Sequence, residues 1–190
     1  MLEFFKSIDR TLFLFLNNLH FDWLDPIVFS LTNALTWLPL FVVVIGFIVY
    51  HYRWQALIII LLLGLVILLA DQISASFIKP MVGRLRPSHE PELLPLIHVV
   101  NGYKGGFYSF VSSHAANAFG VATFLWLTVR KQITWIWIMF IWALIFSYTR
   151  IYLGVHYPGD IIFGGLLGAL IGWVTYKIMN RIPGISKAIT

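Results

Sequence analysis

Three short stretches of the chain carry ionisable side chains inside sequence that is otherwise strongly apolar. They read KPMVGRLRP at residues 79–87, YSFVSSHAAN at residues 108–117 and SYTRIYLGVHYPGD at residues 147–160. An ionised group beside hydrocarbon is costly unless a partner meets its charge. The residue types in these stretches suit the binding and cleavage of an anionic group.

The cations of the three stretches include Lys79, Arg86 and Arg150. A tetrahedral phosphate accepts hydrogen bonds from several Arg and Lys donors at once. Ser112 suits the N-cap of a predicted helix, and the free N–H groups of the first turn, from Ser113 onward, form an anion site that the helix dipole reinforces. Together these groups predict a phosphate cradle.

A possible nucleophile lies in the third stretch, where His156 and Asp160 are four residues apart. A carboxylate at this spacing can bind one imidazole nitrogen, which fixes the tautomer and makes the other nitrogen more nucleophilic. His114 supplies a second imidazole suited to general acid work. Taken alone, the His–Asp pair is equally consistent with a helix cap or with two metal ligands. Beside three cations a metal ion is disfavoured, because the local field repels it, and no metal or cofactor is expected.

The three stretches resemble the signature motifs of the type 2 phosphatidic acid phosphatase superfamily, whose members include membrane lipid phosphatases and the soluble vanadium haloperoxidases. The resemblance spans residues 79–160. The matching residues are, in order, Lys79 with Arg86 and Pro87, then Ser112, Ser113 and His114, then Arg150, His156 and Asp160. Three positions depart from the usual pattern, because Val111, Ser113 and Thr149 stand where Pro, Gly and Ser are common.

The resemblance implies roles for these residues. His156 would be the nucleophile that forms a phosphohistidine, Asp160 would orient it, and His114 would protonate the leaving oxygen. The family needs no metal. The residues implied for the phosphate cradle are Lys79, Arg86, Arg150, Ser112 and Ser113.

The composition indicates that the elements around these motifs cross a membrane. The 190 residues are 59% hydrophobic and only 11% charged, with a mean hydropathy of +0.85, whereas soluble domains are usually about 45–50% apolar and about 25% charged. No cysteine is present, so disulfides and thiolate chemistry are excluded. Glu3 and Asp9 argue against a cleavable signal peptide. No nucleic-acid module is apparent.

The predicted fold is an all-α integral membrane bundle forming a single domain over residues 1–190. A span needs roughly 20 apolar residues. Residues 4–18, within an N-terminal segment 1–25, are amphipathic and predict an interfacial helix, with a sixth span as the alternative. The five predicted spans are Pro26–Tyr50, Trp54–Ile78, Ser112–Val129, Ile133–Leu153 and Pro158–Met179.

One connection, residues 79–111, is long and carries part of the motifs, and we expect it on the outer side of the membrane. Short loops on the cytoplasmic side are enriched in Lys and Arg. The cations assigned to that side are Arg53, Arg130, Lys131, Lys177, Arg181 and Lys187. The three motifs then share the opposite, outward face.

Five further residues of the long loop are expected to have no role in catalysis. His89, Glu90, Glu92 and His98 match no strong metal motif and are expected in solvated loop. Arg84 is expected to contact a headgroup or the loop rather than the bound phosphate.

The sequence therefore predicts a multi-pass cell-membrane phosphatase whose partners are a lipid phosphate substrate and the surrounding lipids, with no nucleic-acid partner. Undecaprenyl diphosphate is the favoured substrate, and phosphatidylglycerol phosphate, phosphatidic acid and a lipid A phosphate remain open. A transporter or channel with an anion site and a non-catalytic lipid-phosphate-binding protein are the alternatives. The oligomeric state is not determined.

Overall fold

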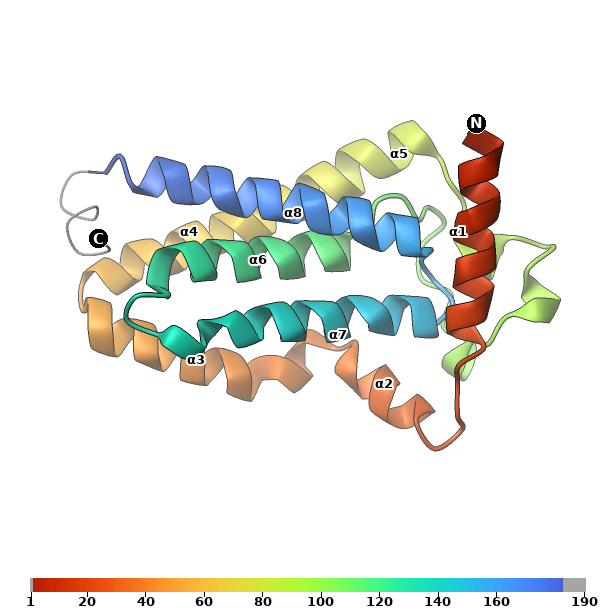
Figure 1. The fold of residues 1–190 in the computed structure, drawn as a ribbon, viewed down its shortest axis with the longest axis horizontal. Helices are drawn as coiled ribbons and strands as arrows, with labels where there is room; N and C mark the ends of the chain where they lie inside the picture. The colour runs from red at the N-terminus through yellow and green to blue at the C-terminus, as the bar shows by residue number, and fades with distance from the viewer. Residues whose placement is uncertain (1, 183–190) are drawn as a thin grey trace.

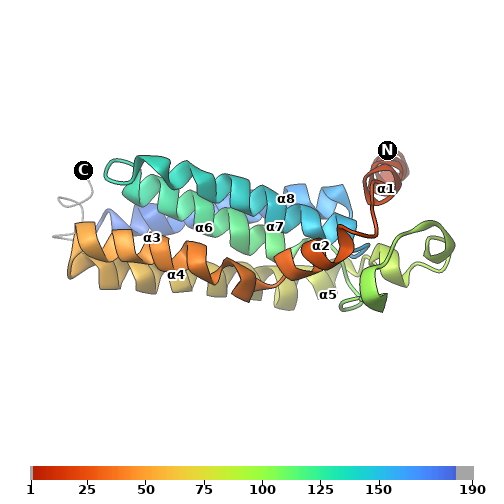
Figure 2. The same ribbon diagram turned by 90° about the horizontal axis from the view of Figure 1, so that it is seen from below.

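The chain folds into helices, and the predicted all-α architecture is confirmed. The computed structural model describes residues 2–182, and the bounds of its helices are α1 Leu2–Asn17, α2 Asp25–Leu31, α3 Leu38–Tyr52, α4 Gln55–Asp71, α5 Lys79–Val82, α6 Ser113–Val129, α7 Ile138–Tyr152 and α8 Pro158–Met179. Figures 1 and 2 show α3, α4, α6, α7 and α8 running side by side along the long axis of the molecule. The loop after α5 gathers at one end of this bundle.

Between residues 2 and 182, four continuous helical segments are long and apolar enough to cross a membrane, which supports a multi-pass membrane protein. They are Ala34–Tyr52, Gln55–Val82, Thr134–Tyr152 and Pro158–Met179. The other predicted span corresponds to α6, which has 17 residues and is therefore about 25 Å long. It packs against α4, α7 and α8 at the centre of the bundle, and eleven of its residues are buried.

The first predicted span, Pro26–Tyr50, is divided in the structure. Its beginning forms the short helix α2, and the membrane-length segment starts only at Ala34. Asn33 lies between them with an extended backbone, and its side chain accepts a hydrogen bond from the Leu35 amide over 3.0 Å. An Asn that caps a new turn in this way ends one helix and begins another. The break brings Thr32 to the end of the bundle where the motifs lie.

Close packing of α6 against α8 depends on small residues. Gly164, Gly168 and Gly172 recur at four-residue spacing on α8, and a Cβ at any of them would collide with the backbone of α6. Small residues let two membrane helices approach closely. This contact holds the start of α6 beside the start of α8.

The N-terminal helix α1 crosses the end of the bundle. It is drawn along its length in Figure 1 and end-on in Figure 2, so its axis lies across those of the long helices. Phe4, Phe5, Ile8 and Phe15 are exposed, whereas Phe13 is fully buried. An apolar outer face on a helix lying across the spans is the arrangement of an interfacial helix.

The long loop folds back on itself over the end of the bundle. The Arg86 amide donates to the Phe107 carbonyl over 3.0 Å, and the Ser109 amide donates to the Arg84 carbonyl over 2.8 Å. These bonds join the two ends of the loop, so residues far apart within it meet. The positively charged residues Arg53, Arg130 and Lys131 belong to turns at the other end of the bundle; Lys187 lies outside the described residues.

Candidate active site

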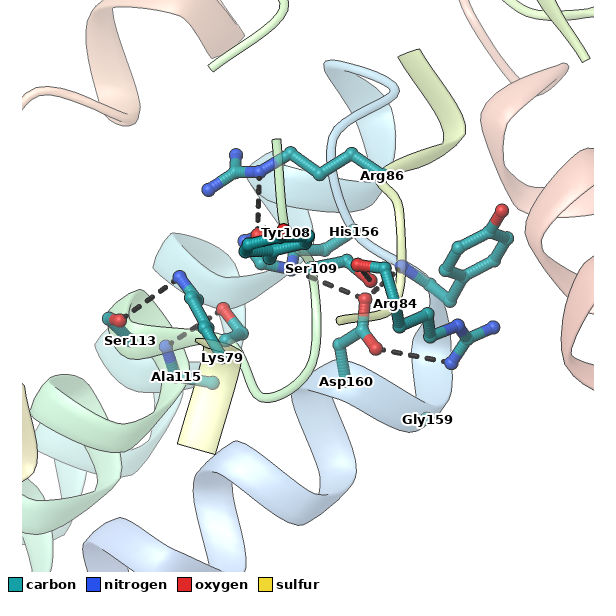
Figure 3. A network of polar contacts seen from close by, with 12 residues as sticks. Lys79, Arg84, Arg86, Tyr108, Ser109, Ser113, Ala115, His156, Gly159 and Asp160 are labelled. Carbon is teal, nitrogen blue, oxygen red and sulfur yellow. Dashed lines mark hydrogen bonds and ion pairs between the residues drawn. The ribbon is translucent and has the colours of Figure 1, made fainter. Parts of the chain in front are cut away.

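Lys79 lies at the start of α5, which continues the helix that begins as α4. A π-helical stretch, Gln72–Ile78, joins α4 to α5, and Gly83 ends α5 in the left-handed conformation at φ 62°. π-Helical turns are frequent at functional sites because they re-aim side chains. Lys79 Nζ donates to Ser113 Oγ at the start of α6 over 3.2 Å, and Ser74 Oγ donates to the same oxygen over 2.8 Å. Figure 3 shows the contact between Lys79 and Ser113.

Arg86 lies in the loop with its side chain buried. Its Nε donates to the Tyr108 carbonyl over 3.1 Å, as Figure 3 shows. Its Nη1 is buried and has no hydrogen-bond partner within residues 2–182. Burial, and after it the charge of Arg150, lower the pKa of Arg86 to about 10. The side chain remains a cation at neutral pH and has a donor left for a ligand.

Arg150 is almost completely buried, with 1% of its surface exposed. Its Nη1 donates to Thr32 Oγ1, and its Nη2 donates to the Tyr103 hydroxyl over 3.0 Å. Its Nε is buried and has no hydrogen-bond partner in the described part of the chain. A buried cation with an unpaired N–H is strongly unfavourable. An anion that accepted this hydrogen bond would remove the penalty.

The start of α6 has the predicted N-cap. Ser112 is extended, its Oγ accepts from the Ala115 amide over 3.4 Å, and its own amide donates to the Asp160 carbonyl over 3.0 Å. The last bond ties the first turn of α6 to the first turn of α8. The positive end of the α6 dipole therefore lies next to Lys79, which contacts Ser113 in this first turn.

His156 and Asp160 form the predicted contact. His156 Nδ1 lies 3.3 Å from Asp160 Oδ2, and the Tyr157 amide donates to the same oxygen over 2.9 Å. Their side chains are 1% and 0% exposed. Burial, and then the charges of Arg86, Arg150 and Lys79, hold the pKa of His156 well below its usual value. The lowered pKa favours the neutral imidazole. In the tautomer with the proton on Nδ1, that proton faces the Asp160 carboxylate and Nε2 keeps its lone pair.

His114 borders an open cavity that Arg150 also lines. The cavity has a volume of about 310 Å³, and Arg150, Thr32 and Tyr103 also line it. The ring of His114 stacks against Phe146, with centroids 5.0 Å apart. A second imidazole thus faces the same cavity as the most deeply buried cation.

Some contacts of the site were missed by the sequence reasoning. Arg84, expected to contact a headgroup or the loop, instead forms ion pairs with Asp160 over 3.2 Å and Asp9 over 2.8 Å. Its guanidinium also stacks on Tyr157 at 3.8 Å. The only sequence signal was its position two residues before Arg86. Thr32 and Tyr103, the partners of Arg150, had no signal.

The expectation of a solvated loop was wrong for His98. Its Nε2 lies 2.9 Å from Asp25 Oδ1, and its ring stacks on His20 with centroids 3.8 Å apart. Glu92 does lie in solvent, where it pairs with Arg10. Within residues 2–182, the structure has no group of three His, Asp or Glu residues arranged to hold a metal ion.

Comparisons with known proteins show which family the sequence matches. The family model of the PAP2 superfamily matches residues 55–183. The chain is 40% identical to a lipid A 4'-phosphatase of Bacteroides thetaiotaomicron, over 96% of this chain and 81% of that one. It is 35% identical to a lipid A 4'-phosphatase of Porphyromonas gingivalis, over 93% and 75%.

Among solved structures, the fold is similar to the transmembrane PAP2-type phosphatidylglycerolphosphate phosphatase of Bacillus subtilis. The TM-score is 0.67, the identity is 23%, and the match covers 94% of this chain and 88% of that one. The family match, together with a multi-pass helical fold, places the protein among phosphatases of lipid phosphate esters in membranes. The chain belongs to the PAP2 superfamily.

Proposed function

We propose that the protein hydrolyses a phosphate monoester on a phosphorylated glycolipid of the lipid A type. The phosphate would be transferred to His156, as a phosphohistidine, before water releases it. The observation that carries the proposal is the buried His156–Asp160 pair beside Arg86 and Arg150, each of which has a buried N–H without a partner in residues 2–182. A phosphate bound there would accept both free hydrogen bonds. It would also neutralise the cations that Lys79, Arg86 and Arg150 bring together.

The reaction would proceed in two in-line steps. The anionic phosphate offsets the charge of the cations and allows His114 to be protonated in the complex. Nε2 of His156 then attacks phosphorus and the bond to the lipid oxygen breaks, while protonated His114 gives its proton to that oxygen. Asp160 accepts the Nδ1–H hydrogen bond and stabilises the positive charge that develops on the imidazole. Water then attacks the phosphohistidine, His114 takes the proton of the water, and the P–N bond breaks to release inorganic phosphate.

The lipid is proposed from the relatives and from the cavity. The sequence favoured undecaprenyl diphosphate, but both lipid A 4'-phosphatases match along most of the chain. The cavity next to His114 is lined by Ser30, Thr32, Asn33 and Tyr103. Hydroxyl and amide groups beside an aromatic ring suit the hydroxyls of a sugar better than they suit a polyprenyl tail. A sugar phosphate headgroup is therefore preferred to a polyprenyl diphosphate.

A panel of lipid phosphates tests the substrate. Purified protein is given lipid A, undecaprenyl diphosphate, phosphatidylglycerol phosphate and phosphatidic acid in the same detergent, with EDTA present, and phosphate release is measured. We expect kcat/KM for lipid A to exceed the others by at least about tenfold, since hydrogen-bonding sites discriminate strongly. Vanadate, which mimics the five-coordinate transition state, should inhibit.

Two results of the panel would contradict the proposal. Equal rates on all four lipids would remove the preference for a sugar phosphate. Loss of activity in EDTA that Zn²⁺ or Mg²⁺ restores would show a metal-dependent reaction instead of a histidine nucleophile.

We further propose that the site faces outward. The short turns at the end opposite the site carry Arg53, Arg130 and Lys131, and such loops stay in the cytoplasm. In intact cells, a membrane-impermeant thiol reagent should label Gly106→Cys and leave Gln132→Cys unlabelled. Gly106 has open space around it, whereas a side chain at Gly105 would collide with Arg86. The chain has no other cysteine to react, and the reverse labelling pattern would overturn the orientation.

A further inference from the structure

We propose that Asp9 of α1 and Arg84 of the loop position the Asp160–His156 pair for catalysis, so that the N-terminal helix belongs to the active-site architecture. The inference rests on the proposed role of His156 as nucleophile. Asp9 lies outside the three stretches, and Arg84, although it lies within the first, is not one of the residues that match the signature motifs. The structure nevertheless connects both to the pair through direct ion pairs.

The connection is an unbroken row of charged and polar groups. Arg84 Nη1 lies 2.8 Å from Asp9 Oδ2 and 3.2 Å from Asp160 Oδ1. The other oxygen of Asp160 lies 3.3 Å from His156 Nδ1. Each oxygen of Asp160 thus has its own partner, and rotation of the carboxylate would break both contacts. Figure 3 shows Arg84 and His156 approaching Asp160 from different sides.

Asp9 also binds the helix that carries Asp160. Its Oδ1 accepts a hydrogen bond from the Gly159 amide over 2.7 Å, in the first turn of α8. A carboxylate at a helix N-terminus satisfies a free N–H and meets the positive end of the helix dipole. A Cβ at Gly159 would lie 2.8 Å from Asp9 Oδ2, so a side chain there would crowd this approach. Asp9 therefore holds the backbone one residue before Asp160.

Apolar and polar contacts keep α1 in this place. Phe13 is fully buried and packs edge-to-face on Tyr157, with ring centroids 5.3 Å apart. Tyr157 is also the residue on which Arg84 stacks, and its amide binds Asp160. At the end of α1, the buried Asn17 side chain donates to the backbone carbonyls of Ile151 and Tyr152. The helix is thus fixed at two points, and Asp9 lies on its docked side.

The charges explain why the reaction would need Asp9. An imidazole that bonds phosphorus becomes positive, and a negative carboxylate on its other nitrogen stabilises it. Arg84 alone would neutralise Asp160, whereas Asp9, Arg84 and Asp160 together keep a formal charge of −1. Lys79, Arg86 and Arg150, not this row, surround the proposed phosphate. Loss of the Asp9 carboxylate should therefore slow phosphoryl transfer and leave substrate binding nearly unchanged.

Steady-state kinetics on the full chain test this inference. Asp9→Asn should lower kcat by about 10- to 100-fold, with KM within about twofold of the parent. This is the range found when a partner that orients a metal-binding histidine or carboxylate is removed. Asp9→Glu should recover most of the loss. The longer side chain has room, because Asp9 borders a groove of about 1250 Å³ between α1 and α8.

Two further variants separate positioning from general structure. Asp9→Asn combined with Arg84→Gln should lose less activity than the product of the two single losses, because Asp9 acts largely through Arg84. Glu92→Gln removes an exposed ion pair between the loop and Arg10 of the same helix, and it should keep the parental kcat.

The outcomes that would overturn the inference are distinct. A kcat of Asp9→Asn equal to that of the parent would overturn the inference directly. So would equal losses in Asp9→Asn and Asp9→Glu accompanied by faster hydrogen–deuterium exchange of the α1 amides, because α1 would then have come undocked. In the same set of experiments, reactions of the parental protein are quenched, and the residue that carries the phosphate is identified. Phosphate found on a residue other than His156 would refute the proposed function itself, whatever the Asp9 variants show.

Discussion

Substitution of His156 by Ala should abolish phosphate release, with a loss of at least about 10⁴-fold in kcat, because removal of a nucleophile stops the chemical step. The imidazole is held by Asp160 and kept neutral by burial and by the cations around it, as its lowered pKa reflects. The cations proposed to bind phosphate are separate residues, so vanadate should still bind. The measurements are single-turnover phosphate release and vanadate affinity.

A matched control is His51→Ala. This residue is exposed near the end of α3, away from the site, where it stacks on Phe47, and its loss should leave kcat unchanged. Thermal unfolding of both variants shows whether His156→Ala remains folded. Activity within tenfold of the parent, in a folded His156→Ala protein, would exclude His156 as the nucleophile.

Arg150→Lys should lose about 30- to 1,000-fold in rate although the charge is kept. The guanidinium donates from Nη1 to Thr32 and from Nη2 to Tyr103, and Nε, which has no partner among residues 2–182, is the donor proposed for the substrate. A lysine ammonium is a point charge and cannot reproduce this planar fork. The loss of one charge-assisted contact used in the transition state corresponds to about 2–4 kcal/mol. The measurement is kcat and KM on the preferred lipid.

Arg130→Lys is the corresponding control, because Arg130 is an exposed cation over Trp126 at the opposite end of the bundle. It should behave as the parent does. If Arg150→Lys kept near-parental kcat, a transition-state role for the Nε donor of the guanidinium would be excluded. If it raised KM alone, Arg150 would contribute to ground-state binding and not to the transition state.

The local features of this protein were readable from the sequence because they depend on neighbours in the chain. A carboxylate four residues after a histidine can reach it on or next to one helical turn, and Asp160 does reach His156. Ser112 caps the helix that follows it, as an N-cap residue should. Long apolar segments predicted the membrane helices, and Pro158–Met179 has the same bounds in the structure.

The first predicted span shows a feature that hydropathy did not predict, which is the break between two helices at Asn33. Hydropathy runs almost without interruption from Pro26 to Tyr50, but Asn33 caps a new turn and divides the segment. A single polar side chain changes mean hydropathy little, although its hydrogen bond to the backbone ends a helix. The consequence is functional, since the break places Thr32 against Arg150.

By itself, the sequence determined that the chain is an all-α membrane protein, which residue types gather at one end, and which short-range contacts they make. Only the tertiary structure decided what surrounds them. Arg84 joins Asp160 to Asp9 across 76 and 75 residues of sequence, and Arg150 meets Thr32 across 118. Such pairs leave no periodicity or spacing in the sequence, because they depend on how close packing of α6 against α8 and docking of α1 place whole helices relative to one another.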